Sequence, residues 1–222
     1  MALNQLSKLF HKLNPHLNPT FLSDTINLIR SCYTERHRHY HNFFHLSECV
    51  KEAEVIEGKF SNYDAALFAL IYHDLYWIPN SKTNEEMSAD RAYYDAHQLG
   101  MSKDFCNTVR SLILSTRHNS TDVDNLDTAL VRDIDFCILG KDPGHYLCYE
   151  SGVKLEYTSF FDKNHYLEGR VKFLEMILRR KHIFFTNLFQ DRYAEQARKN
   201  IRTTLACFEN NDFNLTKWML RY

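Results

Sequence analysis

The sequence predicts an all-α protein with a single helical domain, and three observations support this fold class. Apolar residues recur every three to four positions along most of the chain, which is the spacing of amphipathic helices. The 222 residues include only six glycines and four prolines, too few for the many turns of a sandwich or barrel. A chain of this length can bury one full core, so we expect one domain over residues 1–222.

Four helices are predicted in the first third of the chain. A short N-terminal helix should end near Pro15 and Pro19, and a second should cover about 21–34. A third should begin near Phe43 and stop at Gly58. The fourth is expected at about 63–77, and because residues 65–72 are apolar almost all round, this helix should be central and buried.

Six more helices are predicted after the loop that follows. Thr83, with Glu86 three residues later, predicts a capping box at the start of a helix that stops at Gly100. Further helices are expected at about 102–116 and 125–139, the second ending at Gly140. Apolar spacing marks three more in the C-terminal third, around 146–157, 171–178 and 189–208.

Composition and charge restrict the class of protein. Hydrophobic content of 44% with 25% charged residues is ordinary for a soluble globular chain, and the net charge of −1 argues against a large nucleic-acid interface. Six cysteines without Cys-x-x-Cys spacing favour buried, reduced thiols over a disulfide framework. No signal peptide or membrane-spanning run is present, so a cytoplasmic protein without a membrane partner is expected.

Histidine is the compositional outlier, with twelve in the chain and several between His37 and His45. His45 lies at the start of one predicted helix, and His73 and Asp74 end the next. Two imidazoles and a carboxylate on neighbouring helices are suitable ligands for a divalent metal. The alternative is a hydrogen-bonded His–Asp pair in an ordinary core.

A fourth ligand should come from a later helix, where Asp135 is the best candidate. Asp133 is the alternative, but it lies two positions away and therefore on a different face of the helix. Four protein ligands around a six-coordinate ion leave positions for water and substrate, which is a catalytic arrangement.

These segments together resemble the HD superfamily of metal-dependent phosphohydrolases, whose pattern is His, then His-Asp, then Asp. The segments RHYHNFFH, YHDLYW, NEEMSA and DIDFCILG are similar to one bacterial branch described as predicted HD phosphohydrolases. The resemblance covers about residues 20–210 and implies an HD-type helical bundle with its core there, between a short N-terminal helix and a C-terminal tail. It implies the metal ligands His45, His73, Asp74 and Asp135. One divalent ion is expected (Mn, Mg, Co, Ni, Fe or Zn), because the extra histidine pairs of dinuclear members are absent.

Phosphate chemistry also needs positive charge and positioned donors. We predict catalytic roles for Asp74, Arg38 and His118. Substrate contacts are predicted for a wider set: Arg38, His41, Lys82, Glu85 and Arg117. The alternatives are a solvated surface for Lys82 and Arg117, a capped first helical turn for Glu85, and a loop hydrogen bond for His41.

The expected function is metal-assisted hydrolysis of a phosphate ester or anhydride, with a nucleotide or another small phosphorylated metabolite as substrate. Three alternatives remain open: a non-catalytic nucleotide-binding or regulatory module, an RNA-acting phosphodiesterase or nuclease, and an oxygen-activating enzyme with two irons. The near-neutral charge disfavours nucleic acid as a partner. The sequence predicts no oligomeric state.

Overall fold

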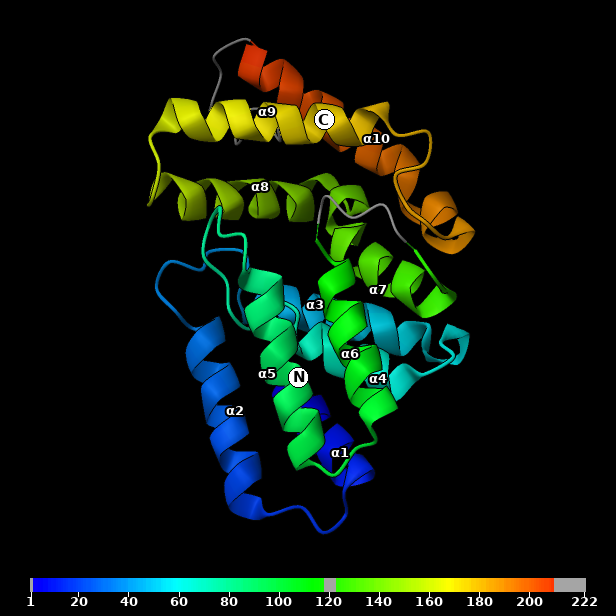
Figure 1. The fold of residues 1–222 in the computed structure, drawn as a ribbon. Coiled ribbons are helices and arrows are strands. Elements are labelled where there is room, and N and C mark those ends of the chain that lie inside the picture. The colour runs from blue at the N-terminus through cyan, green and yellow to red at the C-terminus, as the bar shows by residue number, and fades with distance from the viewer. Residues whose placement is uncertain (1, 118–122, 210–222) are drawn as a thin grey trace. The chain divides into compact units, whose positions relative to one another are not determined.

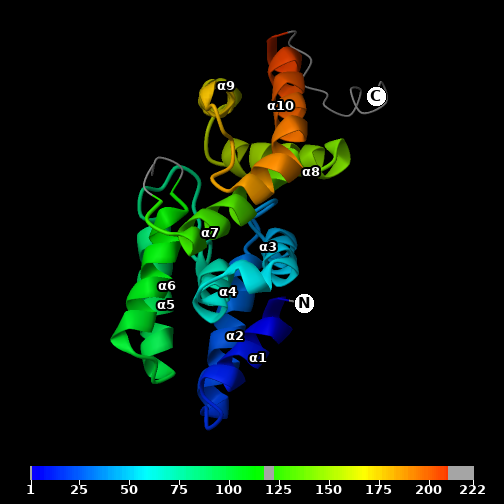
Figure 2. The same ribbon diagram turned by 90° about the vertical axis from the view of Figure 1, so that its right-hand side faces the viewer.

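A computed structural model describes residues 2–117 and 123–209, and every regular element in these ranges is a helix (Figures 1 and 2). The all-α prediction is confirmed. The described residues form ten α-helices and two short 3-10 helices. In chain order these are α1 (Ala2–Leu13), α2 (Pro19–Tyr33), α3 (Phe43–Val55), η1 (Glu57–Lys59), α4 (Tyr63–Tyr72), α5 (Asn84–Gln98), α6 (Lys103–Ser115), α7 (Leu126–Phe136), η2 (Cys137–Gly140), α8 (Pro143–Thr158), α9 (Lys163–Arg179) and α10 (Asn187–Glu209).

The helices fall into two compact units, which we call unit 1 (residues 1–134) and unit 2 (residues 135–222). Unit 1 contains α1 to α6 and most of α7, and unit 2 contains η2 and α8 to α10. The division falls inside α7, between Ile134 and Asp135. The organisation of the whole chain as one domain stays a prediction.

Helix α4 is the centre of unit 1. Its residues 65–72 are all buried, with exposed fractions of 4% or less, and the helix packs against α1, α3, α5 and α6. The rings of Phe10, Phe68 and Tyr72 stack in series on one side of it. This burial confirms the central helix that its apolar sequence predicts, and it supplies hydrophobic stabilisation on several sides.

The end of α4 differs from the prediction, because the helix stops at Tyr72 rather than continuing to Trp77. His73 still has helical backbone angles, and the chain then turns. The side chain of Arg38 donates to the backbone oxygens of Asp74 and Leu75, at 2.6 and 2.8 Å. These bonds replace helical partners that the two carbonyl groups lack in the turn.

Asp127, in the first turn of α7, anchors that helix to the start of α4. The backbone N–H groups of Ser61 and Asn62 donate to its carboxylate oxygens at 2.7 and 2.8 Å. Asn62 is itself the N-cap of α4, since its side chain accepts from the N–H of Ala65. One carboxylate therefore joins the beginnings of two helices in unit 1.

The capping box predicted at the start of α5 is wrong. Thr83 occupies the N-cap position but makes no capping hydrogen bond with its side chain. Glu86 instead forms an ion pair with Arg117. The start of α5 is held by Asn84, whose side-chain amide accepts from the N–H of Ile78 and donates to its carbonyl oxygen.

Unit 2 contains a buried ion pair between α8 and α9. The guanidinium of Arg170 donates to both carboxylate oxygens of Glu150, and Tyr146 donates its hydroxyl proton to the same carboxylate. The hydroxyl of Thr204 in α10 donates to Tyr146. Since a buried charge is stable only when paired and hydrogen-bonded, this network sets how the three helices of unit 2 pack.

All six cysteines are free thiols in the structure, and the prediction that they are buried is confirmed for all except Cys148. Five are buried and Cys148 is exposed. None of the helices in the described residues combines the length and the apolar character needed to cross a membrane.

Gly140 of η2 lies directly against α10. A Cβ atom added there would overlap the backbone of Tyr193 and would lie 2.6 Å from its Cβ. We expect Gly140→Ala to destabilise the protein by about 1–3 kcal/mol, because backbone atoms would have to move apart. The measurement is the urea midpoint of the helical circular-dichroism signal.

The matched control for this prediction is Gly169→Ala. Gly169 is exposed in the interior of α9 with open space around it. Alanine should stabilise the helix there by roughly 0.5–1 kcal/mol. Equal midpoints for the two variants would contradict the close packing of η2 on α10.

Candidate metal centre

Three side chains of unit 1 meet where α3 packs against the end of α4. His45 is the third residue of α3, His73 follows the last residue of α4, and Asp74 comes next. The Nε2 atoms of the two histidines are 3.1 Å apart. Oδ2 of Asp74 lies 3.0 Å from Nε2 of His73 and 3.4 Å from Nε2 of His45. We call these three residues the His–His–Asp cluster.

The separations in the His–His–Asp cluster match those of ligands around one ion. With metal–ligand bonds of about 2.1 Å, adjacent ligand atoms lie roughly 3.0 Å apart in an octahedron and roughly 3.4 Å apart in a tetrahedron. The observed values run from 3.0 to 3.4 Å. One ion could therefore contact all three atoms without a rearrangement of the backbone.

The hydrogen-bond roles at the cluster call for a proton or a metal cation between its acceptor atoms. Nδ1 of His73 lies 2.8 Å from the carbonyl oxygen of Leu70, and since a carbonyl only accepts, Nδ1 carries the proton. A neutral His73 then directs the lone pair of Nε2 at the carboxylate oxygen of Asp74. These two acceptor atoms repel one another unless a proton or a metal cation lies among the three cluster atoms.

The pKa of Asp74 agrees with this reading. Burial favours the neutral acid, but the neighbouring imidazoles of His73, His45 and His41 together outweigh it. They hold the pKa of Asp74 well below its usual value, so the side chain is a carboxylate. The side chain of Asp74 is 16% exposed, so the core does not enclose it completely.

Arg38 connects the loop that leads to His45 with the turn that contains Asp74. Its side chain has an exposed fraction of only 1%. The guanidinium donates to Glu35, to the backbone oxygen of His41, and to the backbone oxygens of Asp74 and Leu75. These bonds join the loop before α3 to the turn after α4. The loop then enters α3 through Asn42, which caps the helix by accepting from the N–H of Phe44.

Arg38 is thus placed differently from a typical phosphate-binding arginine. Its donors bind protein atoms and it is buried, which indicates that it positions Asp74. The predicted direct contact between Arg38 and substrate stays a prediction.

Cys49 is a neighbour of the cluster that the sequence reasoning missed, because the residue also fits the apolar stripe of α3. Its sulfur lies 3.7 Å from both Nδ1 and Nε2 of His45. The ligand atoms of His45, Cys49 and His73 lie within 4.8 Å of one another, and this group could hold a metal ion. A sulfur at equal distance from both ring nitrogens lies beside the imidazole rather than on the lone-pair axis of Nε2. The signal in the sequence was the spacing of four residues, which places His45 and Cys49 on one helix face.

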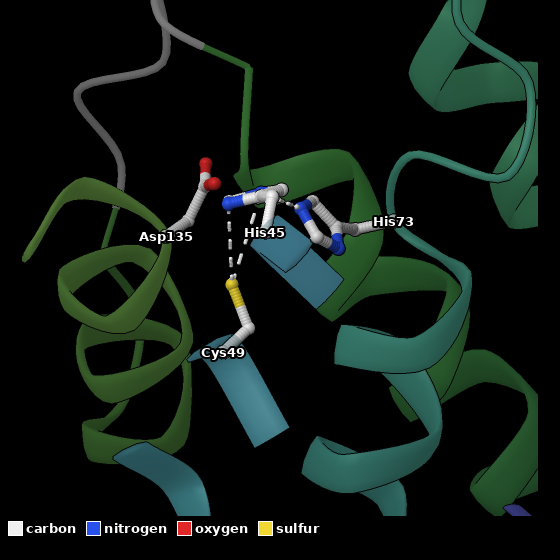
Figure 3. Close-up of side chains that lie close together, drawn as sticks. All are labelled: His45, Cys49, His73 and Asp135. Atoms are coloured by element: carbon white, nitrogen blue, oxygen red, sulfur yellow. Dashed lines mark hydrogen bonds between the residues drawn. The ribbon is translucent and has the colours of Figure 1, made fainter. Parts of the chain in front are cut away.

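Figure 3 draws His45, Cys49 and His73 together with Asp135, which is the first residue of unit 2. Asp133, its alternative, is fully buried in unit 1. In the described residues of unit 1, neither Asp133 nor Asp74 belongs to the group of potential ligands that His45, Cys49 and His73 form, although Asp74 lies within 3.4 Å of both imidazoles. The assignment of Asp135 as fourth ligand stays a prediction.

Among the predicted substrate-binding residues, His41 is near the cluster. Its ring stacks on Trp77 with centroids 4.2 Å apart and meets His45 edge-on at 5.8 Å. Lys82 is exposed in the loop before α5, and Glu85 is half-buried in the first turn of that helix. Arg117 pairs with Glu86, and the predicted catalytic residue His118 lies outside the described residues.

Comparison of the chain with protein-family models, with curated proteins and with solved structures finds no match. The resemblance to the HD superfamily stays a prediction from the sequence motifs.

Removing the charge of Asp74 should weaken metal binding strongly. We expect Asp74→Asn to lower the affinity for Co²⁺ or Zn²⁺ at least about tenfold, because an amide is a much poorer ligand than a carboxylate. The measurement is a competition titration against a chelator. Asp104→Asn, at an exposed position in the first turn of α6, is the control and should bind as the wild type does. Equal affinities for the two variants would contradict the site.

Arg38→Gln tests whether Arg38 positions the turn or binds substrate. Loss of its bonds to Asp74 and Leu75 should destabilise the protein by about 1–3 kcal/mol and should also weaken metal binding. Chemical denaturation and the same chelator competition provide the measurements. A purely substrate-binding arginine would leave both quantities unchanged and raise only KM.

Proposed function

We propose that this protein is a metal-dependent phosphohydrolase that cleaves a phosphate ester or anhydride of a small phosphorylated metabolite, with a nucleotide as the favoured class. The observation that supports this most directly is the convergence of two Nε2 atoms and one carboxylate oxygen at 3.0 to 3.4 Å. The order of the motifs, His, then His-Asp, then Asp, adds the resemblance to the HD superfamily. The six free cysteines fit a reducing compartment, and we place the protein in the cytoplasm.

The proposed ligands are the His–His–Asp cluster and Asp135. Helix α7 is anchored by Asp127 at its first turn and continues for eight residues, about two turns, to Asp135. A mixed imidazole and carboxylate set accepts one of several divalent ions: Mn, Mg, Co, Ni, Fe or Zn. Four protein ligands would leave coordination positions for water and for a phosphoryl oxygen.

A bound divalent ion would lower the pKa of a water molecule and polarise a phosphoryl oxygen. The chain's own groups supply the rest of the proposed chemistry. Asp74, held as a carboxylate, can orient the attacking water by accepting a hydrogen bond from it. His41, fixed on the face of Trp77, can donate a hydrogen bond to the phosphate. Lys82 and His118 are the proposed sources of further positive charge.

The test is a phosphate-release screen across nucleotides, carried out with added Mn²⁺, Co²⁺, Ni²⁺ or Mg²⁺ and repeated with a chelator. We expect release that depends on the metal and falls by at least about a hundredfold in His73→Ala, because a ligand is removed. Lys12→Ala, at an exposed ion pair of α1, is the control and should keep full activity.

Each other outcome has a definite meaning. Release that persists unchanged in His73→Ala would show that the activity does not come from this site. Nucleotide binding without release across the whole screen would replace the proposal with the non-catalytic binding module.

A further inference from the structure

The two histidines of the cluster differ in how their protons are fixed. His73 Nδ1 faces a backbone carbonyl, so only one neutral tautomer is allowed there. His45 Nδ1 instead faces the hydroxyl of Tyr40, at 2.9 Å. A hydroxyl can donate or accept, so this partner is compatible with both neutral tautomers of His45.

The metal-free and the metal-bound cluster need opposite tautomers of His45. Without a metal, His73 Nε2 and Asp74 Oδ2 are both acceptors. His45 Nε2 lies 3.1 Å from the first and 3.4 Å from the second, so a proton on His45 Nε2 can be donated to them. His45 Nδ1 is then bare and must accept from Tyr40. With a metal on Nε2, the proton must lie on Nδ1, and Tyr40 must accept.

We propose that Tyr40 is a positioning residue whose hydroxyl reverses its hydrogen bond to His45 when a divalent cation enters the cluster. The proposal rests on the proposed metal centre and adds to it a residue that controls the tautomer. In the metal-free state the phenol donates to Nδ1 and stabilises the proton on Nε2. In the bound state it accepts from Nδ1–H and keeps the Nε2 lone pair directed at the ion.

The surroundings of Tyr40 fit this role. The residue is buried, and its ring packs against that of His45 with centroids 4.7 Å apart. The ring of His41 meets the ring of Tyr40 edge-on, with centroids 4.9 Å apart. The backbone oxygen of Tyr40 accepts from the N–H of Asn42 at 2.7 Å. The phenol is thus held at the imidazole by the same loop that leads into α3.

Tyr40→Phe tests the proposal, since it keeps the packed ring and removes only the hydroxyl. We expect affinity for Zn²⁺, measured by chelator competition, to fall about tenfold to a hundredfold, which is the usual effect of removing a group that orients a metal ligand. The absorption spectrum of the Co²⁺ complex should also change. Tyr146→Phe is the matched control: it removes a buried hydroxyl from the ion-pair network of unit 2, so it should lower stability without changing the zinc affinity.

The tautomers can be observed directly in protein labelled with ¹⁵N-histidine. Long-range ¹H–¹⁵N spectra at a pH of about 8, where an ordinary imidazole is neutral, distinguish a proton on Nδ1 from one on Nε2. His45→Gln identifies the resonances of His45. We expect Nε2–H in the metal-free wild type and Nδ1–H after addition of Zn²⁺.

The same tautomer in both states, or a zinc affinity of Tyr40→Phe within twofold of the wild type, would overturn the role of Tyr40 while leaving the metal centre intact. A wild type that binds no zinc would instead contradict the metal centre, and the role of Tyr40 with it.

Discussion

The hydrogen bonds from Arg38 to the carbonyl oxygens of Asp74 and Leu75 are the constraint on which the candidate centre depends. They end the central helix of unit 1 in a defined turn and tie that turn to the loop that carries Tyr40 and leads to His45. One buried guanidinium with several donors in a planar fork can do this, whereas a lysine offers a single point charge. The positions of the imidazoles and the carboxylate follow from these bonds.

Holding two acceptor atoms, His73 Nε2 and Asp74 Oδ2, 3.0 Å apart costs free energy unless a proton or a cation lies beside both. The fold offsets this cost nearby, through the burial of α4 on several sides and the stacked rings of Phe10, Phe68 and Tyr72. The apolar core therefore stabilises the fold enough to keep the polar cluster in place. Such a balance is expected where a site is preorganised for a ligand.

Local sequence patterns predicted most of the fold. Apolar periodicity placed the helices because it reflects which face each helix buries, and the His and His-Asp motifs identified residues that do come together. The end of α4 was beyond such reasoning, since Arg38 supplies its hydrogen bonds from 36 positions earlier in the chain. The capping box failed for a similar reason, because Asn84 bonds to Ile78 and Glu86 pairs with Arg117. Cys49 was overlooked because a buried thiol has the same apolar pattern as a core residue.

Helix α4 has no polar face along residues 65–72, and this limits the substitutions that its sequence can accept. A helix buried on every side accepts volume-conserving exchanges among apolar residues and little else, so its sequence can drift only in small steps. The loop before α3 and the segment between α4 and α5 carry exposed positions such as Arg36, His39 and Lys82. Variation in specificity is therefore free to accumulate at these exposed positions, while α3, α4 and the buried residues of the two connections keep the ligands in place.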